Sequence, residues 1–278
     1  MNHKTIPLLA SGTFGLRVMS IMALVLSAGA ALTPATARGQ IFVTNISPFT
    51  GNTIGEYNLD GTTVNAALIS GLNDPWTIAV SGSDLFVTYD NGGNGTIGEY
   101  TTSGETVNAS LVSGLNGLGG IAVSGSDLFV TTASGIGEYT TSGATVNASL
   151  VSGLNDPMGI AVSGSDLFFT NDSGGTIGEY TTSGSTVNAA LVSGLDEATG
   201  IAVAGSDLFV TDYNDSIGSW VIGEYTTSGA TVNADLFFTE GVAWGIAVAV
   251  PEPASGSVLL IAGAGILMRR RRRQCHNQ

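Results

Sequence analysis

Short apolar runs separated by polar turn residues follow one another along residues 40–249. Gly, Ser, Thr, Val and Asn are abundant in this part of the chain, charged residues are scarce, and no long helix-forming stretch interrupts the runs. Glycine and asparagine supply the positive φ angles that hairpin turns need. The pattern therefore predicts an all-β fold of short strands joined by tight turns.

One unit recurs five times. The phrase Ile-Gly-Glu-Tyr begins at Ile54, Ile97, Ile136, Ile177 and Ile222, at spacings of 43, 39, 41 and 45 residues. Each copy is accompanied by runs like Leu-Phe-Val-Thr (85–88), Thr-Val-Asn-Ala (106–109) and Gly-Ile-Ala-Val (120–123), with Ser-Gly-Ser-Asp and Thr-Thr-Ser-Gly at hairpin positions. Four short strands in about 42 residues is the period of a β-propeller blade.

The two ends of this body predict how the ring closes. Residues 41–44 match the second strand of a blade, and residues 245–248 match the first strand. We therefore predict a five-bladed β-propeller with four-stranded blades, in which the last strand completes the first blade and removes the open sheet edges. A right-handed β-solenoid is the alternative, but that fold gives no reason for the permuted order.

The N-terminal residues have the features of a secretory signal. Lys4 and Arg17 accompany a run from Val18 to Leu32 that is apolar or small apart from isolated serines. Ala35 and Ala37 then frame an A-x-A cleavage site. We predict a signal peptide over residues 1–37, exported through the Sec translocon and cut after Ala37, and a body over residues 38–249. An uncleaved membrane anchor is the alternative, for which the apolar run is short.

Residues 250–278 form a tail that combines three features. Val250, Pro251, Glu252 and Pro253 precede an apolar run from Ala254 to Met268. The arginine block follows: Arg269, Arg270, Arg271, Arg272 and Arg273. Fifteen helical residues reach about 22 Å, somewhat short of a hydrocarbon core of about 30 Å. A short transmembrane helix with its arginines in the cytoplasm is the plain interpretation of this tail.

The order of these three parts resembles the PEP-CTERM sorting signal of Gram-negative bacteria, over Val250 to Arg273. The resemblance implies processing by an exosortase, a membrane-embedded cysteine transpeptidase-like enzyme, and an association with exopolysaccharide and biofilm matrix. It also implies a protein that is held transiently in the inner membrane and then reaches the cell surface or the extracellular matrix. It says little about what the body does.

The basic residues all lie near the two ends. Between residues 40 and 253 there is no Lys, Arg, His or Cys, whereas all 22 acidic residues fall there. The body is thus a polyanion, and nucleic acid is excluded as a partner because phosphate binding needs Lys and Arg. The single cysteine, Cys275, lies in the tail, so disulfides play no part in the predicted fold.

The residue types that are missing also limit the chemistry of the body. Without His, Cys or Lys there is no Ser-His-Asp triad, cysteine nucleophile, Schiff-base lysine or His/Cys zinc site.

The repeated pieces resemble blades of NHL and lactonase-like propellers, a resemblance that implies the fold but no activity. We therefore expect no enzyme, no catalytic residues and no cofactor. A carboxylate- or calcium-dependent hydrolase acting on glycans or lactones is the alternative.

Residues that recur in every unit are interpreted as architectural, and residues that break the repeat as candidates for binding. The links between strands two and three of a blade, and the links from strand four to the next blade, emerge on one face of a propeller. We call this face the variable face, because here these links differ in length and composition.

The variable face carries residue types that bind sugars or metal ions. Aromatic rings stack on apolar sugar faces, and carboxylates accept hydrogen bonds from hydroxyls or bind Ca²⁺. The candidate ligand-binding residues are Trp76, Tyr89, Asp90, Asp172, Asp212, Tyr213, Asp215, Trp220 and Trp244. No EF-hand or RTX signature is present, so calcium is a weak expectation and no metal ligands are assigned. The alternative is that the tryptophans fill blade junctions and the acids are solvated turns.

These observations together predict a non-enzymatic, exported β-propeller. Its expected role is that of a binding or structural component of the exopolysaccharide matrix or of the cell surface, with polysaccharide or surface proteins as partners.

Overall fold

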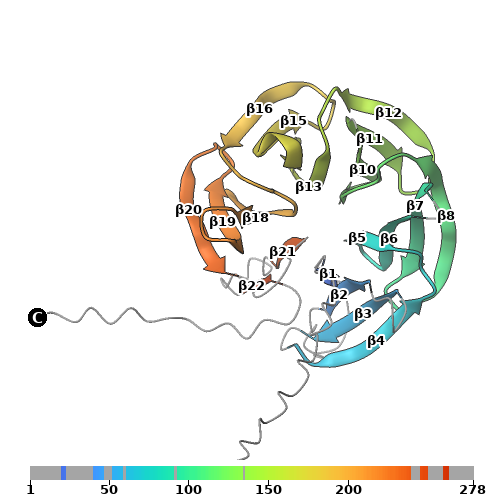
Figure 1. Ribbon diagram of the computed structural model, residues 1–278. Coiled ribbons are helices and arrows are strands. Elements are labelled where there is room, and N and C mark those ends of the chain that lie inside the picture. Colours follow the sequence, from blue (N-terminus) through green and yellow to red (C-terminus); the bar gives the residue numbers. More distant parts are fainter. Residues whose placement is uncertain are drawn as a thin grey trace, which may run out of the picture.

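The computed structural model describes residues 20–22, 40–46, 52–58, 61–90, 93–133, 135–238, 245–249 and 259–262. Within these residues the chain is all-β apart from one 3-10 turn, and five four-stranded antiparallel sheets are arranged around a central axis (Figure 1). The prediction of a five-bladed propeller with four-stranded blades is confirmed.

The strands follow the repeat in order. Blade one contains β1 (Ser20–Met22), β2 (Gln40–Asn45), β3 (Thr53–Asn58) and β4 (Thr63–Ser70). Blade two contains β5 (Pro75–Ser81), β6 (Asp84–Asp90), β7 (Gly95–Thr101) and β8 (Thr106–Leu115). Blade three contains β9 (Ile121–Ser124), β10 (Asp127–Thr132), β11 (Gly135–Thr140) and β12 (Thr145–Ser152). Blade four contains β13 (Pro157–Ser163), β14 (Asp166–Asn171), the 3-10 turn η1 (Asp172–Gly174), β15 (Thr176–Thr181) and β16 (Thr186–Ser193). Blade five contains β17 (Ile201–Ala204), β18 (Asp207–Asn214), β19 (Ser219–Thr226) and β20 (Thr231–Phe238), and a separate pair is formed by β21 (Ile246–Ala249) and β22 (Leu259–Ala262).

The core lies between neighbouring blades. In one cluster, Phe129 and Ile136 of blade three pack with Ile160 and Leu167 of blade four. Equivalent clusters join blades two and three and blades four and five. Each blade therefore buries its apolar face only when the next blade is present, as in other repeat architectures.

The repeated asparagines shape the outer strands. The Asn147 side chain accepts a hydrogen bond from the backbone N–H of Ser149 at 3.1 Å, where the β11–β12 register shifts between Glu138–Asn147 and Ile136–Val151. The bulge brings Leu150 against Gly184 of the next blade. The same Asn contact recurs in each blade. This supports the architectural interpretation of the repeated asparagines.

A ring of buried threonines, which we call the threonine belt, joins the blades near the axis. It consists of Thr44, Thr88, Thr131, Thr170 and Thr211. Thr131 accepts from Gly120 N in its own blade at 2.7 Å and donates to the Met158 carbonyl of the next blade at 2.6 Å. Thr170 does the same with Gly159 N and the Thr199 carbonyl. The hydroxyls of Thr131 and Thr170 thus satisfy polar backbone groups of two blades.

The prediction that residues 245–248 pair with the first blade is wrong for this structure. The inner strand of blade one is β1, from the predicted signal peptide, while β21 pairs with β22 from the predicted tail. Each sheet edge accepts one partner, and segments near the two ends of the chain pair with the edges that ring closure would join. The local composition of the strands does not distinguish these partners.

Most of the predicted terminal segments lie outside the described residues, including Ala35, Ala37, residues 250–258 and the arginine block. Of the predicted tail helix, only Leu259–Ala262 is described, and it is a strand where the sequence predicts a helix. An apolar run forms a strand when an open sheet edge supplies backbone partners. Among the described residues, no helix is long and apolar enough to cross a bilayer.

Candidate functional site

On the variable face, the segment that leads into the first strand of a blade is hydrogen-bonded to the end of the second strand of the same blade. The backbone N–H of Asp90, the last residue of β6, donates to the carbonyl of Asp74, which precedes β5, at 3.3 Å. The same bond joins Asp172 to Asp156 in blade four and Tyr213 to Glu197 in blade five. These bonds hold variable loops on a rigid scaffold, an arrangement that is typical of binding surfaces.

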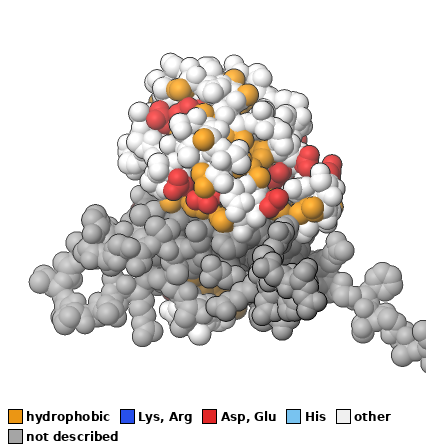
Figure 2. Space-filling view, turned by 90° about the vertical axis from the view of Figure 1, so that its left-hand side faces the viewer, with side chains coloured by type: hydrophobic (Ala, Val, Ile, Leu, Met, Phe, Trp, Pro, Cys, Tyr) orange, Lys and Arg blue, Asp and Glu red, His pale blue; other side chains and the backbone are white. Residues whose placement is uncertain are grey.

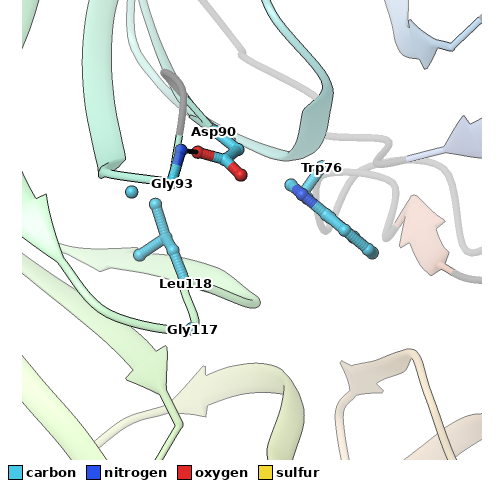
Figure 3. Close-up of a pocket in the computed structure, with 6 residues that line it drawn as sticks. Trp76, Asp90, Gly93, Gly117 and Leu118 are labelled. Atoms are coloured by element: carbon cyan, nitrogen blue, oxygen red, sulfur yellow. Dashed lines mark hydrogen bonds between the residues drawn. The ribbon is translucent and has the colours of Figure 1, made fainter.

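A pocket of about 140 Å³ lies on this face between blades two and three, lined by Trp76, Asp90, Gly93, Gly95, Gly117 and Leu118. Figure 3 shows the Trp76 ring on one side and Leu118 on the other, with the Asp90 carboxylate between them. One Asp90 oxygen accepts the Gly93 N–H at 2.7 Å, and the other points into the open space. The pocket therefore combines a flat aromatic surface, an apolar wall and a hydrogen-bond acceptor.

The backbone of Trp76 is held by the first blade, because the Thr44 hydroxyl donates to its carbonyl at 3.2 Å. The opposite wall of the pocket requires a glycine at position 95, where the backbone lies close to Leu115 and Leu118. A Cβ on Gly95 would lie 2.7 Å from the Leu115 carbonyl oxygen and 2.7 Å from Leu118 Cβ. A larger residue at position 95 would therefore displace the wall of the pocket.

The acids of blade five bond to their own loop. The carboxylate of Asp212 is buried and accepts the backbone N–H groups of Glu197 at 2.9 Å and Asp196 at 3.1 Å. Asp196 in turn accepts from Asp215 N at 2.8 Å. Burial raises the pKa of Asp212, while the N–H donors oppose that rise. These contacts fix the loop conformation and leave Asp212 little surface for a ligand.

Three aromatic candidates pack within the protein. Tyr89 is buried, and its hydroxyl donates to the Ala109 carbonyl of β8. Trp220 is 9% exposed, and its ring lies 5.5 Å from that of Tyr213, tilted by 60°. The two rings lie next to each other because Tyr213 and Trp220 are opposite residues of the β18–β19 pair. This geometry favours a structural role for Tyr89 and Trp220.

The candidate residues do not form one site. Trp76 and Asp90 share the pocket in blade two, Asp172 lies beside Asp156 in blade four, and Asp212, Tyr213 and Asp215 lie in blade five. Trp244 lies outside the described residues. The sequence reasoning missed Gly93, Gly95, Gly117 and Leu118. Gly117 and Leu118 could have been found from the sequence, because Asn116-Gly117-Leu118 replaces the Asn-Asp-Pro of two other copies of the repeat.

Two left-handed aspartates mark the links into blades two and four. Asp74 has φ of 45° and Asp156 has φ of 56°, a region that non-glycine residues seldom adopt. Burial raises the pKa of Asp172, and the charge of Asp156 raises it further. Within the described ranges, no group of three or more His, Cys, Asp or Glu side chains is placed to hold a metal ion. Calcium thus has no preformed carboxylate cage among these residues.

The repeated glutamates predict a pH dependence of stability. Burial raises the pKa of Glu138, and the charge of Asp127 raises it further. Glu99 and Glu179 are shifted in the same direction by burial and a neighbouring aspartate. The folded protein therefore binds these protons more tightly than the unfolded chain. The resulting stability is complete below the ordinary glutamate pKa and is lost as pH rises through the raised values.

We expect the thermal unfolding midpoint to fall as pH increases from 4.5 towards neutrality, at constant ionic strength. The variant Glu138→Gln should show a weaker dependence, because one of the shifted groups is gone. A midpoint that rises with pH over this range would contradict the expectation.

No family model matches the chain, and no curated protein matches it in sequence. Solved structures do resemble it, among them virginiamycin B lyase and TolB-like β-propellers. A chain from a nidogen/laminin complex is 19% identical with a TM-score of 0.60, over 70% of this chain and 75% of that one. Putative TolB from Agrobacterium tumefaciens is 15% identical with a TM-score of 0.58, over 76% and 82% of the two chains.

A catalytically inactive His-to-Ala variant of virginiamycin B lyase from Staphylococcus aureus, crystallised with quinupristin, is 19% identical with a TM-score of 0.52. The similarity covers 84% of this chain and 79% of the lyase. At these identities the three neighbours establish the propeller fold of this chain, and their functions do not transfer with it.

Proposed function

We propose that this protein is an exported, non-enzymatic β-propeller that binds a neutral polysaccharide at the cell surface or in its matrix. The observation that carries the proposal is the pocket between Trp76 and Asp90. An aromatic ring and a carboxylate that line the same small cavity suit a sugar ring, which has an apolar face and hydroxyl donors.

The charge of the body favours a neutral ligand over an acidic one. All 22 acidic residues and no basic residue lie between residues 40 and 253. Figure 2 shows acidic side chains scattered over a largely uncharged surface, with no Lys or Arg on the described part of that side. An anionic polysaccharide would therefore meet repulsion at every approach.

Binding can be tested by affinity electrophoresis of the protein in gels that contain a soluble neutral β-glucan or alginate. We expect retardation by a neutral glucan and none by alginate. The Trp76→Ala variant should bind about tenfold more weakly, because a central aromatic anchor contributes more than 1 kcal/mol.

Trp220→Phe is the matched control, since Trp220 packs on Tyr213 and does not line the pocket. It should bind like the parent protein. Equal binding by Trp76→Ala and the parent would refute the pocket assignment. Failure of the parent to bind any glycan of a broader panel would leave only a structural role.

Hydrolysis of glycans or lactones is the second candidate function. The observation that favours it is the contact of Asp172 with Asp156 in blade four, where burial and the neighbouring carboxylate raise the pKa of Asp172, the direction that general-acid catalysis requires. Such a hydrolase would act without a histidine, because this chain has histidine only at His3 and His276, outside the body. In this it would differ from the lyase neighbour, which is inactive in a variant that lacks one histidine. Turnover of a bound glycan that is lost in Asp172→Asn would select this second candidate.

The export route rests on the ends of the chain. The order of Pro251-Glu252-Pro253, an apolar run and five arginines supports processing by an exosortase. The A-x-A site at Ala35 and Ala37 supports cleavage of a signal peptide. Removing the host's exosortase should leave the tail attached and increase the mass of the protein, whereas deleting residues 250–278 should give a body close to the size of the processed wild-type protein. An intact tail on the exported wild-type protein would indicate a plain membrane anchor instead.

A further inference from the structure

Two segments from the ends of the chain cover the two strand edges at which the ring would close. Residues Ser20–Met22 of β1 pair with Asn45–Val43 of β2. Residues Leu259–Ala262 of β22 pair with Ala249–Ile246 of β21. β1 belongs to the predicted signal peptide and β22 to the predicted sorting tail, so both segments are predicted to be separated from the body during export.

Relative to blade five, β21 already occupies the place of the next inner strand. Ile246 is buried with Ala202, Phe209 and Ile222 of blade five. Ile160 is buried in the same way with the equivalent Ala, Phe and Ile residues of blade three. The backbone approach also repeats. A Cβ built on Gly200 would lie 2.6 Å from Gly245 Cα, and one built on Gly159 would lie 3.1 Å from Gly200 Cα.

The repeat also gives the register in which β21 would pair with β2. In blade three, Ile121 is opposite Val130 and Ser124 is opposite Asp127. The matching residues at closure are Ile246 opposite Val43 and Ala249 opposite Gln40. The four residues of β21 that would pair in this register, Ile246–Ala249, are the residues that pair with β22 in the structure. On the edge of β2, Val43 pairs with Met22 of β1.

We propose that β1 and β22 are temporary partners, and that the ring closes by pairing of β21 with β2 once the two end segments have been removed. This inference rests on the processing part of the proposed function. Residues 23–39 tether β1 to β2, and residues 250–258 tether β22 to β21, so both contacts are intramolecular. Cleavage of the tethers converts each segment into a separate peptide that dilution removes.

The proposed exchange makes completion of the propeller depend on processing at both ends. Before processing, the belt residue Thr44 lies opposite Ile21 of the signal peptide. After processing it lies opposite Gly245, as Thr131 lies against Gly120, whose N–H donates to its hydroxyl at 2.7 Å. The precursor is then an open ring, in which the two closing edges pair with end segments, and the mature body is a closed one. Closure makes residues 246–249 a strand of blade one, so that the first and last parts of the body hold each other against unfolding and proteolysis.

Disulfide trapping in the full chain tests this proposal. All variants carry Cys275→Ser, which removes the native thiol, and specific protease sites within residues 23–39 and 250–258. The closure reporter is Gln40→Cys with Ala249→Cys, and the precursor reporter is Ser20→Cys with Asn45→Cys. Directly opposed residues of antiparallel strands lie within the Cα separation that a disulfide spans. The control pair is Ser124→Cys with Asp127→Cys in blade three, which are already opposite each other.

Before cleavage, we expect the precursor reporter and the control to cross-link and the closure reporter to remain reduced. After both cuts, the closure reporter should cross-link at least tenfold more than before and reach the extent of the control. Equal cross-linking of the closure reporter before and after cleavage would overturn the proposal. So would its failure after cleavage while the control still forms. The added protease makes either result independent of exosortase recognition and of glycan binding.

Discussion

Replacing Phe129 by alanine should lower the free energy of unfolding by about 3–5 kcal/mol. Phe129 is 2% exposed and packs with Ala122 and Ile136 of its own blade and Ile160 of the next. Truncation leaves a cavity between two rigid sheets, and neither sheet moves inwards without breaking the threonine belt. Chemical denaturation followed by tryptophan fluorescence or circular dichroism measures the loss.

Val146→Ala is the matched control for Phe129→Ala. Val146 is 53% exposed on the outer strand β12 of the same blade, so its truncation should change stability by no more than about 0.5 kcal/mol. Comparable losses in the two variants would mean that the clusters between blades do not carry the stability of the fold.

Most of the fold could be predicted because one local pattern occurs five times. Ile-Gly-Glu-Tyr forms the third strand of every blade, in β3, β7, β11, β15 and β19. The glycines of Thr-Thr-Ser-Gly adopt the positive φ that such turns require, as Gly143 does with φ of 86°. Each of these features depends on residues that are close in sequence, and repetition makes them recognisable.

The pairing of the end strands could not be predicted in the same way. Pairing at an edge depends on which segment reaches it, and Ser20–Met22 reaches β2 although it does not match the repeat. Backbone hydrogen bonds are the same for any partner. A sequence pattern therefore indicates that a strand exists, while tethering and competition decide its neighbour.

The candidate site was predicted only in part for a similar reason. The variable face and the candidates Trp76 and Asp90 follow from where the repeat breaks, whereas their shared pocket is seen only in the structure. The roles of Tyr213 and Trp220 depend on a link that the structure forms as an extended hairpin, with Asn214 opposite Ser219. A loop of the same length would have exposed both rings. Link length alone does not distinguish these two conformations.

Replacing Gly159 by alanine should lower the free energy of unfolding by about 3 kcal/mol, because the added methyl group meets backbone atoms of the next blade. Its Cβ would lie 2.5 Å from the Thr199 carbonyl oxygen and 2.9 Å from Ile201 N. Gly159 N also donates to that carbonyl at 2.8 Å, so the two inner strands cannot separate without losing this bond. The thermal midpoint should fall by about 10 °C, at about 2–4 °C per kcal/mol for a domain of this size.

Gly164→Ala separates this crowding from the conformational preference of glycine. Gly164 has φ of 58° in the turn between β13 and β14, and no atom lies within 4 Å of the position that the added methyl group would take. Its replacement should cost about 1 kcal/mol, from the left-handed backbone alone. A larger loss at Gly164 than at Gly159 would contradict the close approach of the inner strands. The expected order, with Gly159 the more sensitive, follows from a ring in which glycine backbones and threonine hydroxyls set the spacing of the blades around the axis.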